Sequence, residues 1–278
     1  MIDVLTWNVF HGRDHPPDPA LITWRSWLFG TEERNATHVQ VNRDLFDEFA
    51  GVLAAARWDV ALLQEFPPRW ADAMAHACEA DMRLTLTSRN WLRAIRTAIA
   101  RRRPDLMGAW EGGANVIFAR NALRFRPGSH EIVLRGPPER RIVTLARLDP
   151  GLVVANLHAS GPTPLAVEDT RRAAEAAVDW SGDDPLILGG DLNVSPRESG
   201  IFDELARRFG LGPPSGRRSI DHLLARGLEI VEPPVPWPAD AREVPAGDRL
   251  IRLSDHSPVH AAFEFASNRP SDRPPIMG

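Results

Sequence analysis

The sequence predicts an α/β protein in which two β-sheets pack against each other, with helices on the outside. Short apolar runs of strand length recur along the 278 residues, and amphipathic helical patterns separate only some of them. This mixed order favours two packed sheets over one doubly wound sheet, in which strands and helices would alternate strictly. We expect a single domain over 1–266, followed by a Pro-rich polar tail over 267–278 that is disordered.

Eight apolar runs have the length and β-branched content of strands. Turn-forming or polar residues bound most of them, which is typical of strands that end at the surface of a sheet protein. In chain order the runs are "DVLTWNV" (3–9), "DVALLQ" (59–64), "ANVIFAR" (114–120), "RIVTLARL" (141–148), "GLVVANLH" (151–158), "PLILGGD" (185–191), "SIDHLLA" (219–225) and "PVHAAFEF" (258–265).

Four segments have helical periodicity, namely 43–57, 69–83, 165–180 and 200–210. In the first of them, apolar side chains recur at the spacing that places them on one face of a helix. Residues 12–42 fit neither pattern and are predicted to be a long irregular insertion, a kind of loop that is usually functional or disordered. Because the insertion starts just after Asn8, we hypothesise that it closes over a site there.

Composition excludes several classes of function. The net charge of −4 and the pI near 6.1 argue against a protein that coats nucleic acid by charge alone. The chain contains no Lys, which rules out a lysine nucleophile or Schiff base. Cys78 is the single cysteine, so we expect no internal disulfide, no thiolate zinc cluster and no disulfide-linked partner. The first residues resemble a strand rather than a leader, and no apolar run is long enough to span a membrane, so we expect a soluble cytoplasmic protein.

Polar side chains of one chemical kind accompany the predicted strands. Ligands of layered α/β proteins bind where strands end, because rigid strands aim their terminal side chains into one crevice. Strand alternation is also expected to place Asp191 and Asn193 on the same side. The candidate site residues are Asn8, Glu65, His158, Asp191, Asn193, Asp221, Asp255 and His256.

The donor types of this set indicate a hard divalent cation. Carboxylates from Glu65, Asp191 and Asp255, together with the amides, are the ligands that Mg²⁺ or Mn²⁺ prefers, whereas zinc would require more His or Cys. The imidazoles of His158 and His256 can donate hydrogen bonds to phosphate or transfer protons near neutral pH. Carboxylates, amides, two histidines and a divalent cation together indicate a phosphate-ester hydrolase.

Seven stretches resemble the endonuclease/exonuclease/phosphatase superfamily, in the order in which that family has them. They are "TWNVF", "LLQE", "GGANVIFAR", "ANLHASG", "GGDLNVSP", "SIDHLLARG" and "LSDHSPV", and they span residues 2 to about 265. The resemblance implies a four-layer α/β/β/α sandwich. It also implies that Glu65 binds the metal, with Asn8 beside it holding metal or phosphate, and that Asp255 completes the metal region. Asp191 would orient and activate the attacking water, and Asn193 would hold the phosphate.

The same resemblance assigns the histidines. His256 would contact the scissile phosphate, with Asp221 fixing its ring, and His158 would stabilise charge on the phosphoryl oxygens. Abasic-site endonucleases have a Tyr where this chain has His158, and the chain contains no Tyr. The pattern therefore favours the deoxyribonuclease, sphingomyelinase and inositol phosphatase branches. Asn115 matches a family position near the site, where it would bind the substrate, and a hydrogen-bonding role within the sheet is an equal alternative.

Two other histidines and one basic segment leave alternatives open. His11 follows Asn8 closely enough to reach the site or to be a surface residue, whereas His222 alternates away from Asp221 and is left out. The Arg-rich segment 89–103 is expected to be a solvated helix face, and it could also contact nucleic acid or an anionic membrane weakly. The tryptophans at 24, 27, 91 and 110 fit either partner or the core.

The sequence therefore predicts a Mg²⁺- or Mn²⁺-dependent phosphoesterase that cleaves by attack of a water activated by the metal and by Asp191. A phosphodiester is the favoured substrate, with DNA or RNA slightly ahead of a phospholipid headgroup. A phosphomonoesterase of the same fold is the first alternative. A non-catalytic binding module on that fold is the second.

Overall fold

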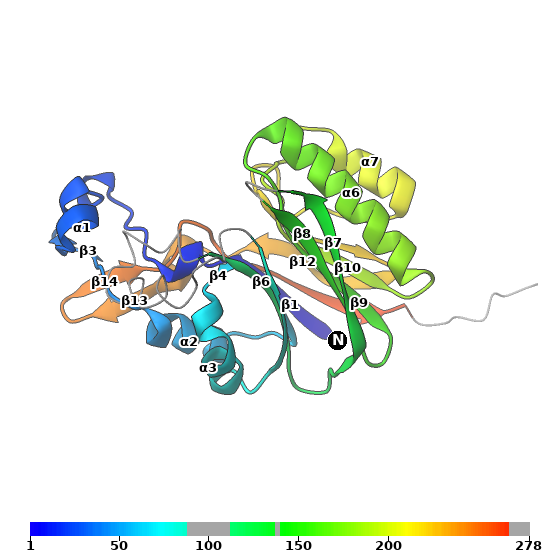
Figure 1. Ribbon diagram of the computed structural model, residues 1–278, viewed down its shortest axis with the longest axis horizontal. Helices are drawn as coiled ribbons and strands as arrows, with labels where there is room; N and C mark the ends of the chain where they lie inside the picture. The colour runs from blue at the N-terminus through cyan, green and yellow to red at the C-terminus, as the bar shows by residue number, and fades with distance from the viewer. Residues whose placement is uncertain (88–111, 137–139, 267–278) are drawn as a thin grey trace, which may run out of the picture.

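The computed structural model describes residues 1–87, 112–136 and 140–266, and it contains two β-sheets packed face to face with helices on both outer faces (Figure 1). This arrangement confirms the predicted four-layer sandwich, and each of the eight predicted runs forms a strand. The Arg-rich segment 89–103, with Trp91, the tryptophan at 110 and the predicted tail 267–278 lie outside the described residues.

The first sheet has six strands in the order β12-β15-β1-β4-β6-β5. Its central pair, β1 and β4, is parallel, and the neighbouring pairs are antiparallel. The carboxyl ends of β1 and β4 therefore lie side by side at one edge of the sandwich. The strands are β1 (Ile2–Asn8), β4 (Val60–Phe66), β5 (Asp81–Leu86), β6 (Ala114–Ala119), β12 (Leu228–Pro236) and β15 (Val259–Phe265).

The second sheet has five strands in the order β11-β10-β9-β8-β7. Its one parallel pair is β9 and β10, in which Asp191 lies opposite His158. β11 runs antiparallel to β10, so its first residue, Asp221, also lies opposite Asp191. The strands are β7 (Phe125–Arg135), β8 (Arg141–Leu148), β9 (Leu152–His158), β10 (Leu186–Asp191) and β11 (Asp221–Arg226).

Three apolar clusters fill the spaces between the layers. The first packs helices α2 and α3 on the outer face of the six-stranded sheet, and the second packs α6 and α7 on the outer face of the five-stranded sheet. The third lies between the sheets and contains Val4, Leu62, Val154, Ile187 and Leu223. The helices are α2 (Phe46–Ala55), α3 (Ala71–Ala77), α6 (Thr163–Ser181) and α7 (Ile201–Phe209).

The helix predicted over 69–83 is shorter than expected. A 3-10 turn (Pro68–Trp70) precedes α3, and α3 ends at Ala77. Glu79 then adopts a left-handed backbone conformation with φ of 51°. The chain then reverses, and Asp81–Leu86 forms β5 against β6. Its apolar residues, Met82 and Leu84, are spaced by two and pack on the core beneath α3, so the pattern is that of a strand. Cys78 is buried beside α3, and burial raises the pKa of its thiol to about 11, which makes it a packing residue.

The prediction of an irregular 12–42 segment is wrong in part. A 3-10 turn (Phe10–Gly12) leads into this segment, which contains a second 3-10 turn (Pro19–Leu21), helix α1 (Trp24–Phe29) and the two-stranded pair β2 (Glu33–Arg34) and β3 (Val39–Gln40). The segment packs on a second hairpin, β13 (Glu243–Ala246) with β14 (Arg249–Arg252). The backbone N–H of Leu250 donates to the carbonyl of Thr37, and the Arg249 side chain donates from Nε to the carbonyl of Asn35. A 3-10 turn (Ala239–Arg242) precedes that hairpin. Helix α1 lies at one end of the molecule (Figure 1), and the side chain of its first residue, Trp24, is exposed.

Two adjacent glycines let β10 pack closely between its neighbours. A Cβ on Gly189 would lie 2.8 Å from Leu62 of the other sheet, and a Cβ on Gly190 would lie 1.8 Å from the carbonyl oxygen of Leu157 on β9. Gly190 also has φ of 135°, which side chains rarely permit. Glycine at both positions therefore allows the end of β10 to lie close to β9 and to the opposite sheet.

In the described part of the chain, none of the helices has both the length and the apolar composition needed to cross a bilayer.

Replacing Gly190 with Ala is expected to destabilise the fold by about 3 kcal/mol or more, because the new methyl group collides with backbone and the φ angle is unfavourable. Denaturant titration of the purified variant measures this. Gly51→Ala is the matched control, since Gly51 lies in α2 with open space around its Cα, and it should stabilise by about 0.5–1 kcal/mol. Equal stability of Gly190→Ala and the wild type would contradict the packing argument.

Candidate functional site

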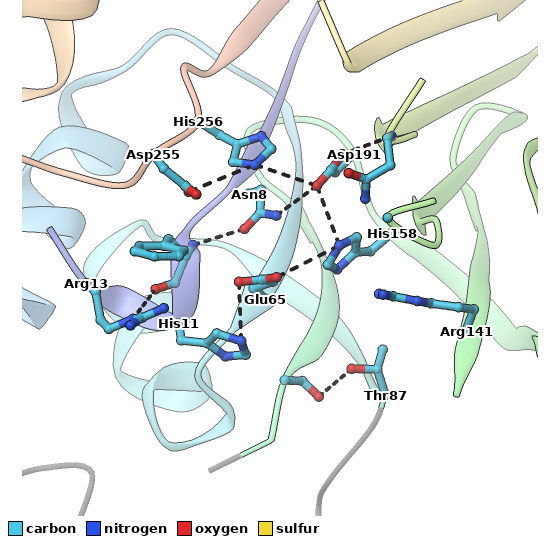
Figure 2. A pocket seen from close by; sticks show the side chains of 14 residues that line it. Asn8, His11, Arg13, Glu65, Thr87, Arg141, His158, Asp191, Asp255 and His256 are labelled. Carbon is cyan, nitrogen blue, oxygen red and sulfur yellow. Dashed lines mark hydrogen bonds and ion pairs between the residues drawn. The ribbon is translucent and has the colours of Figure 1, made fainter. Parts of the chain in front are cut away.

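A pocket of about 380 Å³ opens at the edge of the sandwich where both parallel strand pairs end (Figure 2). Its walls come from both sheets and from the loops that follow β1 and β14. Seven of the residues predicted from the sequence line it: Asn8, Glu65, His158, Asp191, Asn193, Asp255 and His256.

Strand alternation aims four of the predicted side chains into the space between the sheets. On β1, Asn8 continues the face of Val4, which packs between the sheets. On the second sheet, His158 and Asp191 continue the faces of Val154 and Ile187, and Asp221 precedes Leu223 on the inner face of β11. The polar ends of these strands therefore lie directly above the apolar inter-sheet core.

Glu65 reaches the pocket because of a β-bulge. Ala61 and Leu63 face the helices, so plain alternation would turn Glu65 toward that side as well. The pairing of β4 with β6 shifts register between Leu63 and Phe66, and Glu65 has φ of 49°. The extra residue rotates the carboxylate into the pocket and returns Phe66 to the helix side.

Asn193 lines the pocket for a different reason from the predicted one. β10 ends at Asp191, so strand alternation does not extend to Asn193. Instead, Asp191 Oδ1 accepts a hydrogen bond of 3.0 Å from the backbone N–H of Asn193, which adopts φ of 50°. This local turn is typical of Asp. The Asn193 amide then donates to the carbonyl of Ala159 at 3.0 Å, which ties it to the end of β9.

The segment before β15 delivers Asp255 and His256. Ser254 has φ of 58° and donates its hydroxyl hydrogen to the carbonyl of Asn8 at 2.7 Å. Its Oγ accepts the backbone N–H of His256 at 3.0 Å, and Trp7 Nε1 donates to the His256 carbonyl at 3.0 Å. These contacts fix the segment against the end of β1, beside the pocket.

One direct hydrogen bond crosses between the sheets inside the pocket. Asn8 Nδ2 donates to Asp191 Oδ2 at 2.9 Å, while Asn8 Oδ1 accepts the backbone N–H of Phe10 at 3.0 Å. His158 Nε2 lies 3.5 Å from the same Asp191 oxygen, and His256 Nε2 lies 3.8 Å from it. Asp191 is therefore the centre on which the amide and both imidazoles converge.

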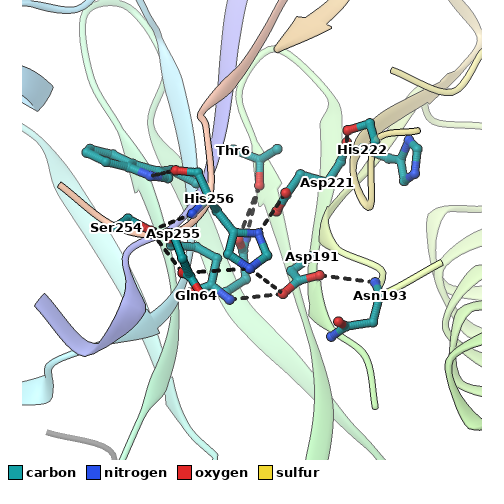
Figure 3. A network of polar contacts seen from close by, with 12 residues as sticks. Thr6, Gln64, Asp191, Asn193, Asp221, His222, Ser254, Asp255 and His256 are labelled. Atoms are coloured by element: carbon teal, nitrogen blue, oxygen red, sulfur yellow. Dashed lines mark hydrogen bonds and ion pairs between the residues drawn. The ribbon is translucent and has the colours of Figure 1, made fainter. Parts of the chain in front are cut away.

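His256 is held as a cation by Asp221, which lies behind the pocket wall (Figure 3). Burial alone would lower the pKa of His256, but the 2.8 Å hydrogen bond from Nδ1 to Asp221 Oδ2 and the charges of Asp221, Asp191 and Asp255 raise it to about 10. At neutral pH its Nε2–H therefore points into the pocket as a charged donor.

The pKa values of His158 and Asp191 are shifted in the directions that favour their neutral forms. Burial lowers the pKa of His158 to about 3, against the opposing charge of Glu65, so its imidazole is neutral. Burial, with the nearby charge of Asp221, raises the pKa of Asp191, and burial likewise raises the pKa of Asp221. Asp191 is thus a carboxyl group that can exchange a proton near neutral pH.

The side chains that line the pocket fit a divalent cation. Glu65, Asp255 and Asp191 supply carboxylate oxygens and Asn8 supplies an amide oxygen to one pocket, which is the oxygen-rich chemistry of a Mg²⁺ or Mn²⁺ site. Distance alone also groups Asp191, Asp221 and His256 as a possible metal site. We favour Glu65 as the anchor, because a His256 ring that is protonated and bonded to Asp221 cannot offer nitrogen to a metal.

Asn115 and His222 are not among the residues that line the pocket. Asn115 does not line the pocket, and its Nδ2 donates to the carbonyl of Ile142 at 2.9 Å, so the contacts match the sheet hydrogen-bonding alternative and not the substrate-binding prediction. His222 alternates away from Asp221 as expected, and its ring contacts Ser215 N and Val194 O (Figure 3).

Sequence reasoning missed several residues that line the pocket, among them Phe10, Arg13, Thr87 and Arg141. Arg13 lies 3.8 Å from the ring centre of Phe10 in the turn after Asn8, and Arg141 is the first residue of β8. The one feature of the sequence that could have indicated these residues is their position at the end of a strand or in the turn after it. His11, which the sequence left open, also lines the pocket.

Left-handed backbone conformations concentrate around this site. Among the described residues other than glycine, seven have positive φ, and five of these lie at the pocket or beside it. The five are Phe10, His11, Glu65, Asn193 and Ser254. Such conformations cost energy and persist where the surrounding structure imposes them, which is common at functional sites.

Comparisons with known proteins agree with this architecture. The family model described as the endonuclease/exonuclease/phosphatase family matches residues 5–256. No curated protein matches the chain significantly in sequence. Similar solved structures include an endonuclease/exonuclease/phosphatase family protein from Bacteroides thetaiotaomicron, with a TM-score of 0.63, 16% identity, and coverage of 95% of this chain and 97% of that one.

Two further solved structures share the fold. A mannosyl-6-phosphatase from Bacteroides thetaiotaomicron has a TM-score of 0.63 and 15% identity, over 95% of this chain and 100% of that one. TDP2 from C. elegans has a TM-score of 0.57 and 12% identity, over 95% of this chain and 75% of that one. At these identities the likeness concerns the fold.

Histidine side-chain NMR is expected to show that His256 keeps its proton until the pH approaches about 10. Because the folded-state pKa lies above the ordinary 6.5, the ion pair stabilises the fold fully below pH 6.5, and this contribution is lost as the pH rises through about 10. In Asp221→Asn the pKa of His256 should fall, since the hydrogen bond to the carboxylate and the charge of Asp221 are lost and only the charges of Asp191 and Asp255 then oppose the effect of burial. His222 is the internal control, with its pKa lowered by burial to about 4. Titration of wild-type His256 near 6.5 would contradict this assignment.

Proposed function

Because the chain belongs to the endonuclease/exonuclease/phosphatase family, we propose that it is a divalent-metal-dependent phosphoesterase that hydrolyses a phosphodiester. The observation that carries the proposal is the convergence of Glu65, Asn8, Asp191 and His256 on one pocket from two sheets and a loop. These are carboxylate, amide and imidazole groups placed to hold a cation, a water molecule and a phosphate together.

Asp191 is proposed to take the proton from the attacking water. Its Oδ1 is occupied by the backbone N–H of Asn193, and its Oδ2 accepts from Asn8, so the carboxylate has one fixed orientation. A fixed carboxylate with a raised pKa is suited to a general base, because it can accept a proton during the reaction and release it afterwards.

His256 and His158 are proposed to act on the phosphate. His256, charged through Asp221, would donate from Nε2 to a non-bridging oxygen and stabilise the charge that develops in the transition state. His158 is neutral and would donate a second hydrogen bond from the opposite wall. Asn193 lies beside Asp191 and is proposed to hold the phosphate in line with the water.

Glu65 is proposed to hold the cation, with Asn8 and Asp255 beside it. When bound there, Mg²⁺ or Mn²⁺ would polarise the phosphate, lower the pKa of the attacking water and favour the ionised form of Asp191. Asp191 need only accept the water's proton, since the imidazoles and the cation balance the charge on the phosphate.

The positions of two arginines favour a phosphodiester in a nucleic acid over a phosphomonoester. Arg13 and Arg141 lie on opposite sides of Glu65 in the pocket (Figure 2). A terminal phosphate would be bound best by guanidinium groups that converge on one point. Arginines on either side suit a strand that carries a phosphate before and after the scissile one, and such contacts position a nucleic acid without reading its sequence.

Other aspects of the sequence-based prediction stay predictions. A phosphomonoesterase is the alternative reaction, and a non-catalytic binding module on the same fold is the alternative class. The cytoplasmic location is not tested by the fold. Weak contact of 89–103 with an anionic membrane concerns residues outside the described ranges, and the hypothesis that 12–42 forms a lid is likewise open, since only Arg13 of that segment lines the pocket.

Asp191→Asn and His256→Gln are each expected to lower the rate of hydrolysis of bis-p-nitrophenyl phosphate by roughly 100-fold or more, because they remove the base and the charged donor. Release of nitrophenol with Mn²⁺ or Mg²⁺ measures the rate, and EDTA should abolish it in the wild type. His76→Ala, which changes an exposed histidine on α3, is the control. Wild-type rates in both site variants would end the catalytic assignment, and binding of a partner without turnover of any phosphoester would favour the binding module.

Arg13→Gln and Arg141→Gln are expected to raise the KM for a single-stranded oligonucleotide by about tenfold, because each removes a charge-assisted phosphate contact. The KM for bis-p-nitrophenyl phosphate, which has no neighbouring phosphates, should change far less. Steady-state kinetics with both substrates measures the difference. A larger effect on p-nitrophenyl phosphate than on the oligonucleotide would favour the phosphomonoesterase.

A further inference from the structure

The carboxylate of Glu65 is in contact with an imidazole that the proposed mechanism does not use. His11 Nε2 lies 3.2 Å from Glu65 Oε2, and both side chains are largely shielded from solvent (Figure 2). His158 Nε2 is farther away, at 3.9 Å from the other oxygen of Glu65. The ring of His256 is hydrogen-bonded to Asp221. Among these three imidazoles, His11 is the one that lies against the proposed metal anchor.

The backbone is in left-handed conformations on both sides of this contact. Phe10, His11 and Gly12 follow one another with φ of 49°, 55° and 74°, and this turn directs the ring of His11 back toward β4. Glu65 itself has φ of 49° in the bulge of β4. The chain just before β6 lies against the ring, since a Cβ on Gly113 would be in van der Waals contact with Cε1 of His11 at 3.4 Å.

The distance between the two side chains suits ligands of one metal ion. In an octahedral site with bonds of about 2.1 Å, neighbouring ligand atoms lie about 3 Å apart. His11 Nε2 and Glu65 Oε2 are 3.2 Å apart, so a cation could bond to both atoms with little movement of either side chain. The larger separation of His158 from Glu65 fits this geometry less well.

We propose that His11 is a nitrogen ligand of the divalent cation that Glu65 holds, and that it makes this site prefer Mn²⁺ to Mg²⁺. The inference rests on the metal site of the proposed function and names its ligand set more closely. Mg²⁺ favours oxygen ligands almost exclusively, whereas transition metals accept imidazole readily. One imidazole in a pocket that is otherwise rich in carboxylate and amide oxygen shifts the preference toward Mn²⁺.

Pulsed EPR of Mn²⁺ bound to the full chain tests the assignment directly. A nitrogen that is bonded to Mn²⁺ gives a ¹⁴N hyperfine signal, whereas a histidine that only hydrogen-bonds to Glu65 does not. We expect the signal in the wild type, its loss in His11→Asn and its retention in His158→Gln. Asn is the chosen replacement because it tolerates the left-handed backbone of position 11, and circular dichroism verifies the fold.

Calorimetric titration with each metal gives an independent measurement. His11→Asn is expected to weaken Mn²⁺ binding by about tenfold or more and Mg²⁺ binding far less, so the preference for Mn²⁺ is lost. His76→Ala, which removes an exposed imidazole on α3, should leave both affinities unchanged and controls for adventitious histidine binding. Equal weakening of both metals would overturn the proposed selectivity.

The outcomes separate this inference from the proposed function. Mn²⁺ that binds without a nitrogen signal, or with a signal that survives in His11→Asn, would overturn the role of His11 and leave the hydrolase intact. Failure of the wild type to bind any divalent cation would overturn both. A nitrogen signal that depends on His11, in a protein that hydrolyses no phosphoester, would support the ligand assignment and contradict only the proposed reaction.

Discussion

The hydrogen bond between Asn8 and Asp191 joins the two sheets at the place where the candidate site forms, and the site depends on that closeness. Just below it, Gln64 donates to Asn156 across the same interface at 2.7 Å, and Asn156 donates in turn to the carbonyls of Leu63 and Val116. Apolar packing between the sheets continues beneath this polar layer. The sandwich core therefore fixes the spacing between groups that belong to different sheets, and no single sheet contains a complete site.

The site also uses burial to give one residue type two charge states. His158 and His256 lie on either side of Asp191, and both are shielded from water. His158 is buried without a hydrogen-bonded carboxylate of its own among the described residues, and its pKa falls to about 3. His256 has Asp221 at 2.8 Å, and its pKa rises to about 10. A neutral imidazole and a charged imidazole thus lie close to the same carboxylate, and the neighbours of each ring make the difference.

The strands in the interior of the sandwich could be predicted from sequence, because a strand that is buried on both faces is apolar throughout its length. In the two large sheets, the strands that were missed are β5, β7 and β12, and all three lie at sheet edges. There one face or one side meets water, and residues such as the prolines of β12 weaken the pattern. For β5 the preceding helix also concealed the change from a period near 3.6 to a period of 2.

The site residues were predictable in type and less so in placement. Glu65 reaches the pocket through a bulge and Asn193 through a local turn, and neither follows from strand alternation. Asn115 matches a family position by its letters, yet its side chain bonds to the neighbouring strand. The arginines at 13 and 141 have no motif around them, because their relation to Glu65 arises only when the strands assemble. The types of the residues predict the chemistry of the site, whereas irregular backbone conformations determine where their side chains point. The five left-handed residues around the pocket carry a consequence for protein engineering. Glycine at these positions would relieve backbone strain, but it would delete the side chains that the irregular backbone orients, among them the Ser254 hydroxyl that bonds to Asn8 and His256. Thermostabilising libraries are therefore best confined to the helices and outer strands.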